Sequence, residues 1–171
     1  MHVPARKSDF SRRSLTADGY EGWTTFSALR PGGGTKIDQE GGTYVVLRVS
    51  RDPPLFLKVS PAGHFKGYDQ TAPLEQLQAN WVVGALVLYI GKANDLDVRL
   101  RCMAAYGAGK RVAHRGGRLL WQLADAPTLL VAWRPVRVGS TPKTDEDDMI
   151  DSFREAYGRP PFANYPNRPG R

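Results

Sequence analysis

The sequence has little of the chemistry that cross-links a chain or anchors it in a membrane. Cys102 is the single cysteine, so no internal disulfide can form, and a reducing, cytoplasmic compartment is expected. With only three histidines as further strong ligands, a structural zinc site is not expected. No run approaches twenty apolar residues, which argues against a membrane span. The first 20 residues contain no apolar segment of the kind that a secretory signal requires.

Positive charge is what the sequence has in excess. Its 171 residues carry a formal net charge of +7, and 41% of them are hydrophobic, which suits one globular domain with a core of its own. Between Tyr89 and Arg137 there are nine lysines or arginines against three acidic residues. This excess predicts an anionic partner, of which nucleic acid is the commonest. A solvated basic surface without a partner is the alternative.

Hydrophobic patterning predicts a small α/β (α+β) domain over residues 21–165, with a flexible basic arm before it (1–20) and a short tail after it (166–171). We expect a mixed sheet flanked by few helices. Strands are expected at 43–49, 55–59, 81–91 and 128–138, the first two forming a hairpin. Helical segments are expected at 20–29, 73–78, 96–105 and 143–157, and residues 118–123 fit a helix or a strand, with helix preferred.

Local signals mark the ends of the two best helices. Asp95 is a plausible cap for the helix at 96–105, and Thr144 or Asp145 can cap the helix at 143–157. Gly158, followed by two prolines, should end that last helix.

The segment from Leu88 to Arg101, LYIGKANDLDVRLR, brings several phosphate-binding side chains close together. An apolar strand containing Tyr89 runs into Gly91 and Lys92, and the helix that follows carries Arg99 on the turn nearest the strand end. Arginine offers phosphate a planar fork of donors, and lysine a compact positive charge. The pattern therefore predicts a phosphate site at this strand end.

With Gly42-Thr43-Tyr44 upstream and the acidic helix start and Pro161-Phe-Ala-Asn164 downstream, this segment resembles the GIY-YIG nuclease superfamily over roughly residues 42–164. The resemblance implies a small sheet with two tyrosines on neighbouring strands, an arginine on the next helix and a metal-binding glutamate on a later one. It also implies an endonuclease that hydrolyses phosphodiester bonds, usually in DNA, with Mg²⁺ (or Mn²⁺) as cofactor.

The resemblance gives each matched residue a role. Tyr44 would act as general base or position the attacking water, and it would need a neighbouring cation because a free tyrosine titrates near pH 10. Tyr89 would contact the phosphate or the water. Arg99 would stabilise the negative charge on the pentavalent phosphate, and Glu146 would hold the metal. The expected substrate-binding residues are Gly91, Lys92, His114 and Asn164, although Asn164 would bond either phosphate or backbone and so tie the tail to the sheet.

The sequence departs from the family pattern at two places. Tyr44 and Tyr89 are 45 residues apart, so the segment at about 51–80 must be an insertion that leaves their strands adjacent. Met103 follows Arg99 by one helical turn where several family members have a polar residue or histidine, and His114 could compensate. The metal ligand is also open, because the aspartates beside Glu146 are alternatives to it.

Three functional hypotheses follow. The first is a metal-dependent nuclease with Tyr44, Tyr89, Arg99 and Glu146 in its site, working as a monomer or a homodimer. The second is a catalytically silent nucleic-acid-binding module of the same fold. The third is an accessory domain that binds another protein. Neither the choice between DNA and RNA nor the specificity follows from the sequence.

Overall fold

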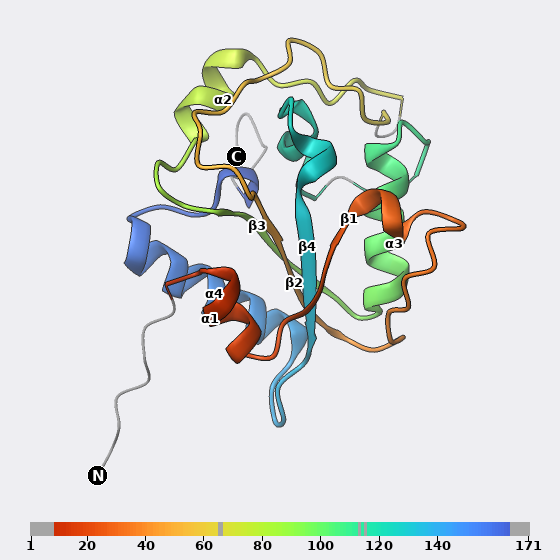
Figure 1. Ribbon diagram of the computed structural model, residues 1–171, viewed down its shortest axis with the longest axis vertical. Coiled ribbons are helices and arrows are strands. Elements are labelled where there is room, and N and C mark those ends of the chain that lie inside the picture. The colour runs from red at the N-terminus through yellow and green to blue at the C-terminus, as the bar shows by residue number, and fades with distance from the viewer. Residues whose placement is uncertain (1–8, 65–66, 113, 115, 165–171) are drawn as a thin grey trace.

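A four-stranded antiparallel sheet forms the centre of the computed structural model, which describes residues 9–64, 67–112, 114 and 116–164. Its strands are β1 (Glu21–Thr25), β2 (Gly42–Leu47), β3 (Val87–Ala93) and β4 (Leu130–Pro135), in the order β1-β4-β2-β3 (Figure 1). Every neighbouring pair is antiparallel. The α+β class predicted from the sequence is confirmed, but the sheet is antiparallel throughout rather than mixed.

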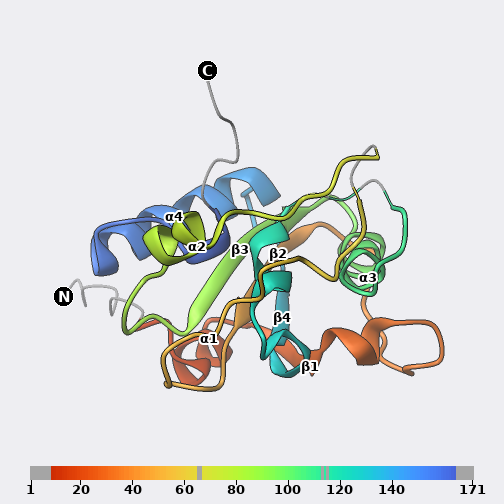
Figure 2. The same ribbon diagram turned by 90° about the horizontal axis from the view of Figure 1, so that it is seen from above.

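Each face of the sheet is covered by its own hydrophobic cluster. On one face, α3 (Leu96–Gly107) and the 3₁₀ turns Phe26–Leu29 and Arg118–Gln122 pack over β2 and β4. On the other face lie α1 (Arg12–Ala17) and α4 (Pro142–Tyr157), so that the sheet is sandwiched between α3 and α4 (Figure 2). Strand β2 is buried along its whole length, which is why its sequence reads as a continuous apolar run.

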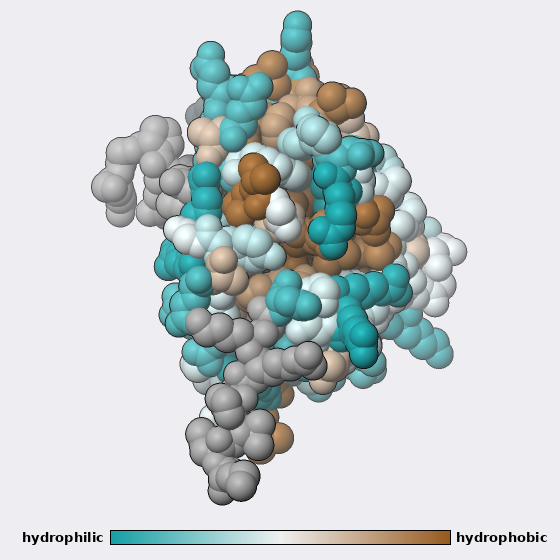
Figure 3. Space-filling model, turned by 60° about the vertical axis from the view of Figure 1, so that its left-hand side comes forward, coloured by the Kyte–Doolittle hydropathy of each residue, from teal (hydrophilic) through white to brown (hydrophobic). Residues whose placement is uncertain are grey.

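The outer surface is mixed rather than apolar. The side on which α2 (Leu74–Asn80) and α4 lie carries its apolar groups in separate patches between polar ones (Figure 3). None of the helices in the described part of the chain has the length and apolarity that crossing a bilayer needs.

The predicted flexible arm is wrong for residues 9–20. Ser11 caps α1 by accepting a hydrogen bond from the Ser14 amide, and Phe10, Leu15 and Tyr20 are all buried in the cluster under α4. The ring of Phe10 packs edge-on against that of Phe153, with centroids 5.2 Å apart. The polar and basic residues between these apolar ones hid their contribution to the core. Residues 1–8 and the predicted tail lie outside the described residues.

The prediction for residues 20–29 is half right. Phe26–Leu29 is helical, as the spacing of Phe26 and Leu29 indicated, but Glu21–Thr25 is an edge strand. The strand has an irregular register against β4 between Glu21 and Thr24, which explains why no clean alternation of apolar residues marked it.

The predicted hairpin between 43–49 and 55–59 is wrong. Of the second segment, only Phe56 forms a bridge, and its partner is Leu123 rather than a residue of β2. Leu55 and Val59 are exposed at 73% and 65%, while Phe56 packs inward. Pro53 and Pro54 remove two backbone donors at the start of the segment, which disfavours continuous pairing.

The inserted segment is instead fastened to the core by Gln122, which is fully buried. Its Oε1 accepts a hydrogen bond from the Ala72 amide, and its Nε2 donates to the carbonyls of Ala72 and Leu57. A second tether is Arg48, whose guanidinium pairs with Asp125 at 2.8 Å and donates to the carbonyls of Ser50 and Asp52. The insertion therefore folds over β2 and β4 without separating β2 from β3.

The helix ends follow the local signals with one exception. Asp95 caps α3 by accepting a hydrogen bond from the Val98 amide, and Gly158 ends α4 with a φ of 76° that favours glycine. The cap of α4 is Thr141, not Thr144 or Asp145. Pro142 in the first helical position favours this earlier start.

Candidate functional site

The two tyrosines lie side by side on one face of the sheet. In the antiparallel pairing of β2 with β3, Tyr44 is opposite Gly91 and Val46 is opposite Tyr89, so all four point to the face that α3 covers. The rings of Tyr44 and Tyr89 are 5.9 Å apart between centroids, inclined at 49°. The expectation that the insertion leaves their strands adjacent is therefore confirmed.

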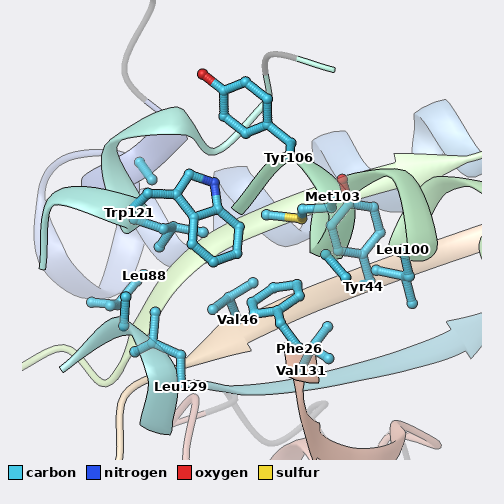
Figure 4. Close-up of a cluster of buried hydrophobic side chains, with 14 of the residues drawn as sticks. Phe26, Tyr44, Val46, Leu88, Leu100, Met103, Tyr106, Trp121, Leu129 and Val131 are labelled. Carbon is cyan, nitrogen blue, oxygen red and sulfur yellow. The ribbon is translucent and has the colours of Figure 1, made fainter. Parts of the chain in front are cut away.

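Gly91 makes room for the ring of Tyr44. A Cβ added at Gly91 would lie 2.4 Å from Cζ and 2.6 Å from the hydroxyl oxygen of Tyr44. Tyr44 itself is packed among Leu100 and Met103 of α3 (Figure 4) and is 1% exposed. Because the ring has little space to retreat, only glycine at position 91 allows this arrangement.

Burial keeps both phenols protonated at neutral pH. It raises the pKa of Tyr44 well above its usual value of 10, and the neighbouring Tyr89 raises it further, while Arg99 lowers it by less. Burial also raises the pKa of Tyr89, against a lowering by its hydrogen bond with Tyr44. The expectation that a nearby cation makes Tyr44 a base near neutrality is not met by the described side chains. Tyr44 is a hydrogen-bond donor instead.

Arg99 and Lys92 are cations without a direct partner. Arg99 is exposed near the start of α3 and lines a pocket of about 270 Å³ together with Cys102 and His114. Lys92 is half-buried on β3 and lies opposite Thr43, on the other face of the sheet from the tyrosines. Neither side chain has a hydrogen bond or ion pair with another described residue. Arg101, by contrast, is used structurally, since it pairs with Asp97 and donates to two loop carbonyls.

Glu146 differs from the acids around it. It is half-buried on the first turns of α4, burial raises its pKa, and Lys92, followed by Lys143, lowers it. No described residue donates a hydrogen bond to it or pairs with it. The four aspartates of this helix all have basic partners at 2.6–3.8 Å, namely Asp145–Arg137, Asp147–Lys143, Asp148–Arg137 and Asp151–Arg154. Among the acids at this helix start, Glu146 is thus the one left available for a ligand.

His114 lies behind Arg99 in the same pocket. It is 2% exposed, and its Nε2 is 2.8 Å from the Gly116 carbonyl, which assigns the proton to Nε2 and leaves Nδ1 as an acceptor. Nδ1 is buried without a hydrogen-bond partner. Burial lowers the pKa of His114 to about 4, and the charge of Arg99 contributes in the same direction. His114 is therefore a neutral imidazole beside the arginine.

Sequence reasoning missed the backbone of Gly116. A Cβ added at Gly116 would lie 2.6 Å from the hydroxyl oxygen of Tyr89, so the glycine forms the wall against which that hydroxyl rests. The paired glycines 116 and 117 in an otherwise basic loop were the available signal, since glycine permits close approach of backbone to another group.

Asn164 binds backbone rather than facing the pocket. Its Oδ1 accepts from the Ile90 amide at 2.8 Å and its Nδ2 donates to the Ile90 carbonyl at 2.7 Å. The side chain thus pairs with the outer edge of β3 as a neighbouring strand would. Of its two expected contacts, backbone or phosphate, the structure shows the backbone one, and Asn164 holds the strand that carries Tyr89 and Gly91.

The four residues assigned to catalysis are brought within electrostatic reach of one another. Arg99 and Glu146 both act on the pKa of Tyr44 and of Tyr89, and Arg99 also acts on that of Glu146. The site therefore surrounds the end of β3, with side chains from β2, β3, α3 and α4.

The donor set fits a divalent ion held by a single carboxylate. Within residues 9–64, 67–112, 114 and 116–164 there is no cluster of three or more His, Cys, Asp or Glu side chains that could bind a metal. Glu146, however, is a partly desolvated carboxylate without a partner, which is unfavourable unless a cation approaches it. Mg²⁺ is commonly bound through one or two carboxylates with several waters retained.

Comparison with protein-family models, with curated proteins and with solved structures found no match to this chain. The resemblance described above therefore depends on the motif residues and on their placement around β3.

Proposed function

We propose that this chain is a metal-dependent endonuclease that hydrolyses phosphodiester bonds in DNA by a GIY-YIG-type mechanism. The observation that carries the proposal is the convergence of Tyr44, Tyr89, Arg99 and Glu146 around the end of β3, from four different elements of the fold. Arg99 and Glu146 are also without partners among the described residues, as ligand-binding groups should be.

The cations would bind and stabilise the phosphate. Arg99 is exposed in the pocket and can present two parallel donors to phosphate oxygens, in the position to stabilise the charge that accumulates in the transition state. Lys92 adds a point charge near Glu146. His114, with its free Nδ1 acceptor beside Arg99, would help to fix the orientation of the guanidinium or of a bound water.

The tyrosines would position rather than deprotonate. Because burial holds the pKa of Tyr44 well above 10, its hydroxyl stays protonated and donates to that of Tyr89. The Tyr89 hydroxyl would in turn donate to the attacking water or to a phosphate oxygen. Glu146 would hold the metal ion. When bound, Mg²⁺ (or Mn²⁺) supplies Lewis-acid polarisation of the phosphate and neutralises the leaving oxygen.

Cleavage of supercoiled plasmid with Mg²⁺ or Mn²⁺, and with EDTA as the blank, tests this proposal. Glu146→Gln should abolish metal-dependent cleavage, whereas its matched control Asp147→Asn should cleave as wild type does. Arg99→Ala should lose about 10²–10³-fold in rate, the usual effect of removing one transition-state donor, and Arg13→Ala on α1 should not. Equal cleavage by wild type, Glu146→Gln and Arg99→Ala would refute the site assignment.

A catalytically silent nucleic-acid-binding module is the second candidate. The protonated state of Tyr44 and the single carboxylate favour it, since both leave the site without a strong base. This candidate is adopted if wild type binds DNA with a steep salt dependence but never cuts it. Absence of affinity at low salt would favour the accessory-domain hypothesis instead.

The cellular setting is part of the same proposal. The single cysteine supports a reducing, cytoplasmic location. One site of this kind cuts one strand, so double-strand cleavage would need two copies, and a homodimer is expected only if the plasmid is linearised in one binding event. Sedimentation with and without DNA distinguishes the two states.

A further inference from the structure

Tyr68 is exceptional among the exposed side chains. Of the large apolar residues exposed in the part of the chain that the structure describes, it is the single aromatic one, and 75% of its surface is accessible. Its backbone is held in place because the side chain of Gln70, itself only 9% exposed, donates to the Tyr68 carbonyl. A flat aromatic face is thus presented to solvent from a fixed position in the insertion.

The segment that carries Tyr68 is fastened to the wall of the candidate site. The Gly63 amide donates to the Tyr106 carbonyl at the end of α3, at 2.8 Å. Arg118 donates to the Gln70 carbonyl. Two positions before Arg118 lies Gly116, the residue against which the Tyr89 hydroxyl rests. Both ribbon views show the insertion running beside the loop that follows α3 (Figures 1 and 2).

That neighbouring loop supplies positive charge. Lys110 and Arg111 are exposed and have no hydrogen bond or ion pair through their side chains with any other described residue. The backbone of Lys110 touches the insertion, since a Cβ added at Gly63 would lie 2.3 Å from the Lys110 carbonyl oxygen. The one acidic residue next to Tyr68, Asp69, is occupied by hydrogen bonds from the Thr71 amide and hydroxyl.

We propose that Tyr68, Lys110 and Arg111, here called the Tyr68 surface, bind unpaired nucleotides next to the cleavage site. Stacking on an aromatic ring requires a base whose face is free, which a duplex does not offer, and phosphates on either side of that base would meet the two cations. The proposal rests on the nucleic-acid site proposed above and names its substrate class: a single strand, or a duplex with an unpaired flap or end.

The test is binding of oligonucleotides in EDTA, so that cleavage plays no part. Fluorescence anisotropy compares a single strand, a blunt duplex and a flapped duplex, and a 2-aminopurine in the unpaired part reports stacking by quenching. Tyr68→Ala should weaken binding of the single strand and the flap by about 5-fold or more and remove the quenching. Tyr68→Phe should keep both. Val59→Ala, an exposed apolar residue of the same insertion, is the matched control.

The charged arm of the test uses Lys110→Ala with Arg111→Ala, against Arg13→Ala on the far side of the sheet. The double variant should lower the slope of log K against log salt by about 1 to 2 on single strands, and Arg13→Ala should not. Single-stranded RNA in place of DNA shows whether the sugar matters.

The proposal is overturned if Tyr68→Ala binds all three oligonucleotides as wild type does, or if the substitution weakens binding of the blunt duplex as much as binding of the single strand and the flap. Cleavage that is independent of Tyr68 would leave the nuclease proposal intact, and stacking without cleavage would leave the Tyr68 surface intact.

Discussion

Replacing Gly91 with alanine tests whether the Tyr44 ring lies across β3, because two effects of opposite sign compete. If the ring were elsewhere, alanine would stabilise the strand by roughly 0.5–1 kcal/mol, since glycine is entropically unfavourable in a strand. In the structure the new Cβ meets three atoms of Tyr44 at 2.4–2.8 Å. Crowding a packed core in this way costs roughly 1–3 kcal/mol. We therefore expect net destabilisation.

Chemical denaturation measures the free energy of unfolding, and thermal unfolding should show a fall in Tm of about 2–4 °C per kcal/mol for a chain of this size. Gly41→Ala is the matched control, because its nearest contacts to an added Cβ are at 3.2–3.5 Å. In a double-mutant cycle, Tyr44→Leu should reduce the effect of Gly91→Ala, since the smaller side chain vacates the space. A Gly91→Ala protein that is as stable as wild type or more stable would refute the placement of the ring.

Three further predictions concern buried polar groups. Gln122→Leu leaves one backbone amide and two carbonyls of the insertion unsatisfied. It should lower the free energy of unfolding, measured by denaturation, by roughly 1–3 kcal/mol for each of these groups. The pKa of His114 is about 4 in the folded protein against about 6.5 unfolded, so the unfolded chain binds the proton first. Protonation of His114 should therefore lower the free energy of unfolding by about 1.4 kcal/mol per pH unit between pH 6.5 and pH 4. His114→Gln should remove this part of the pH dependence. Asp145 has a lowered pKa because hydrogen bonds from Ser140 and Arg137 outweigh its burial, so its stabilisation is present at neutral pH and lost in acid. Asp145→Asn should destabilise by roughly 1.5–3 kcal/mol at pH 7 and by less at pH 3, whereas the exposed pair at Asp147 makes Asp147→Asn nearly neutral.

The elements that the sequence predicted correctly are those whose signals are local. The cap at Asp95 and the end of α4 at Gly158 depend on residues within one turn, and β2 is marked by its own apolar run. Apart from the cap of α4, which the neighbouring Pro142 decides, the main error lies where distant residues decide. The insertion takes its path from Gln122, which binds it across 50 to 65 positions, and no pattern within 51–80 reveals that.

In the candidate site, too, the features with local sequence signals were predicted, and those that depend on distant residues were not. Motif spacing identified Tyr89, Gly91 and Arg99 together because they follow one another in sequence. The protonation state of Tyr44 does not follow from the motif, since it depends on how α3 and the neighbouring ring bury the phenol. Asn164 was assigned to substrate binding or backbone, and only the fold places both its polar groups on Ile90.

Unpaired charges of opposite sign that lie within electrostatic reach of one another are the physical signal that marks the candidate site. Arg48, Arg101 and Arg137 are as charged as Arg99, yet each has an acidic partner within 2.8 Å. Glu146 is close enough to Lys92 and Arg99 for them to lower its pKa, but it forms no ion pair with either. We expect such opposite charges, out of contact with each other, to bind ligands of both signs. A phosphate and a divalent cation together would satisfy both signs, and neither ligand alone would do so.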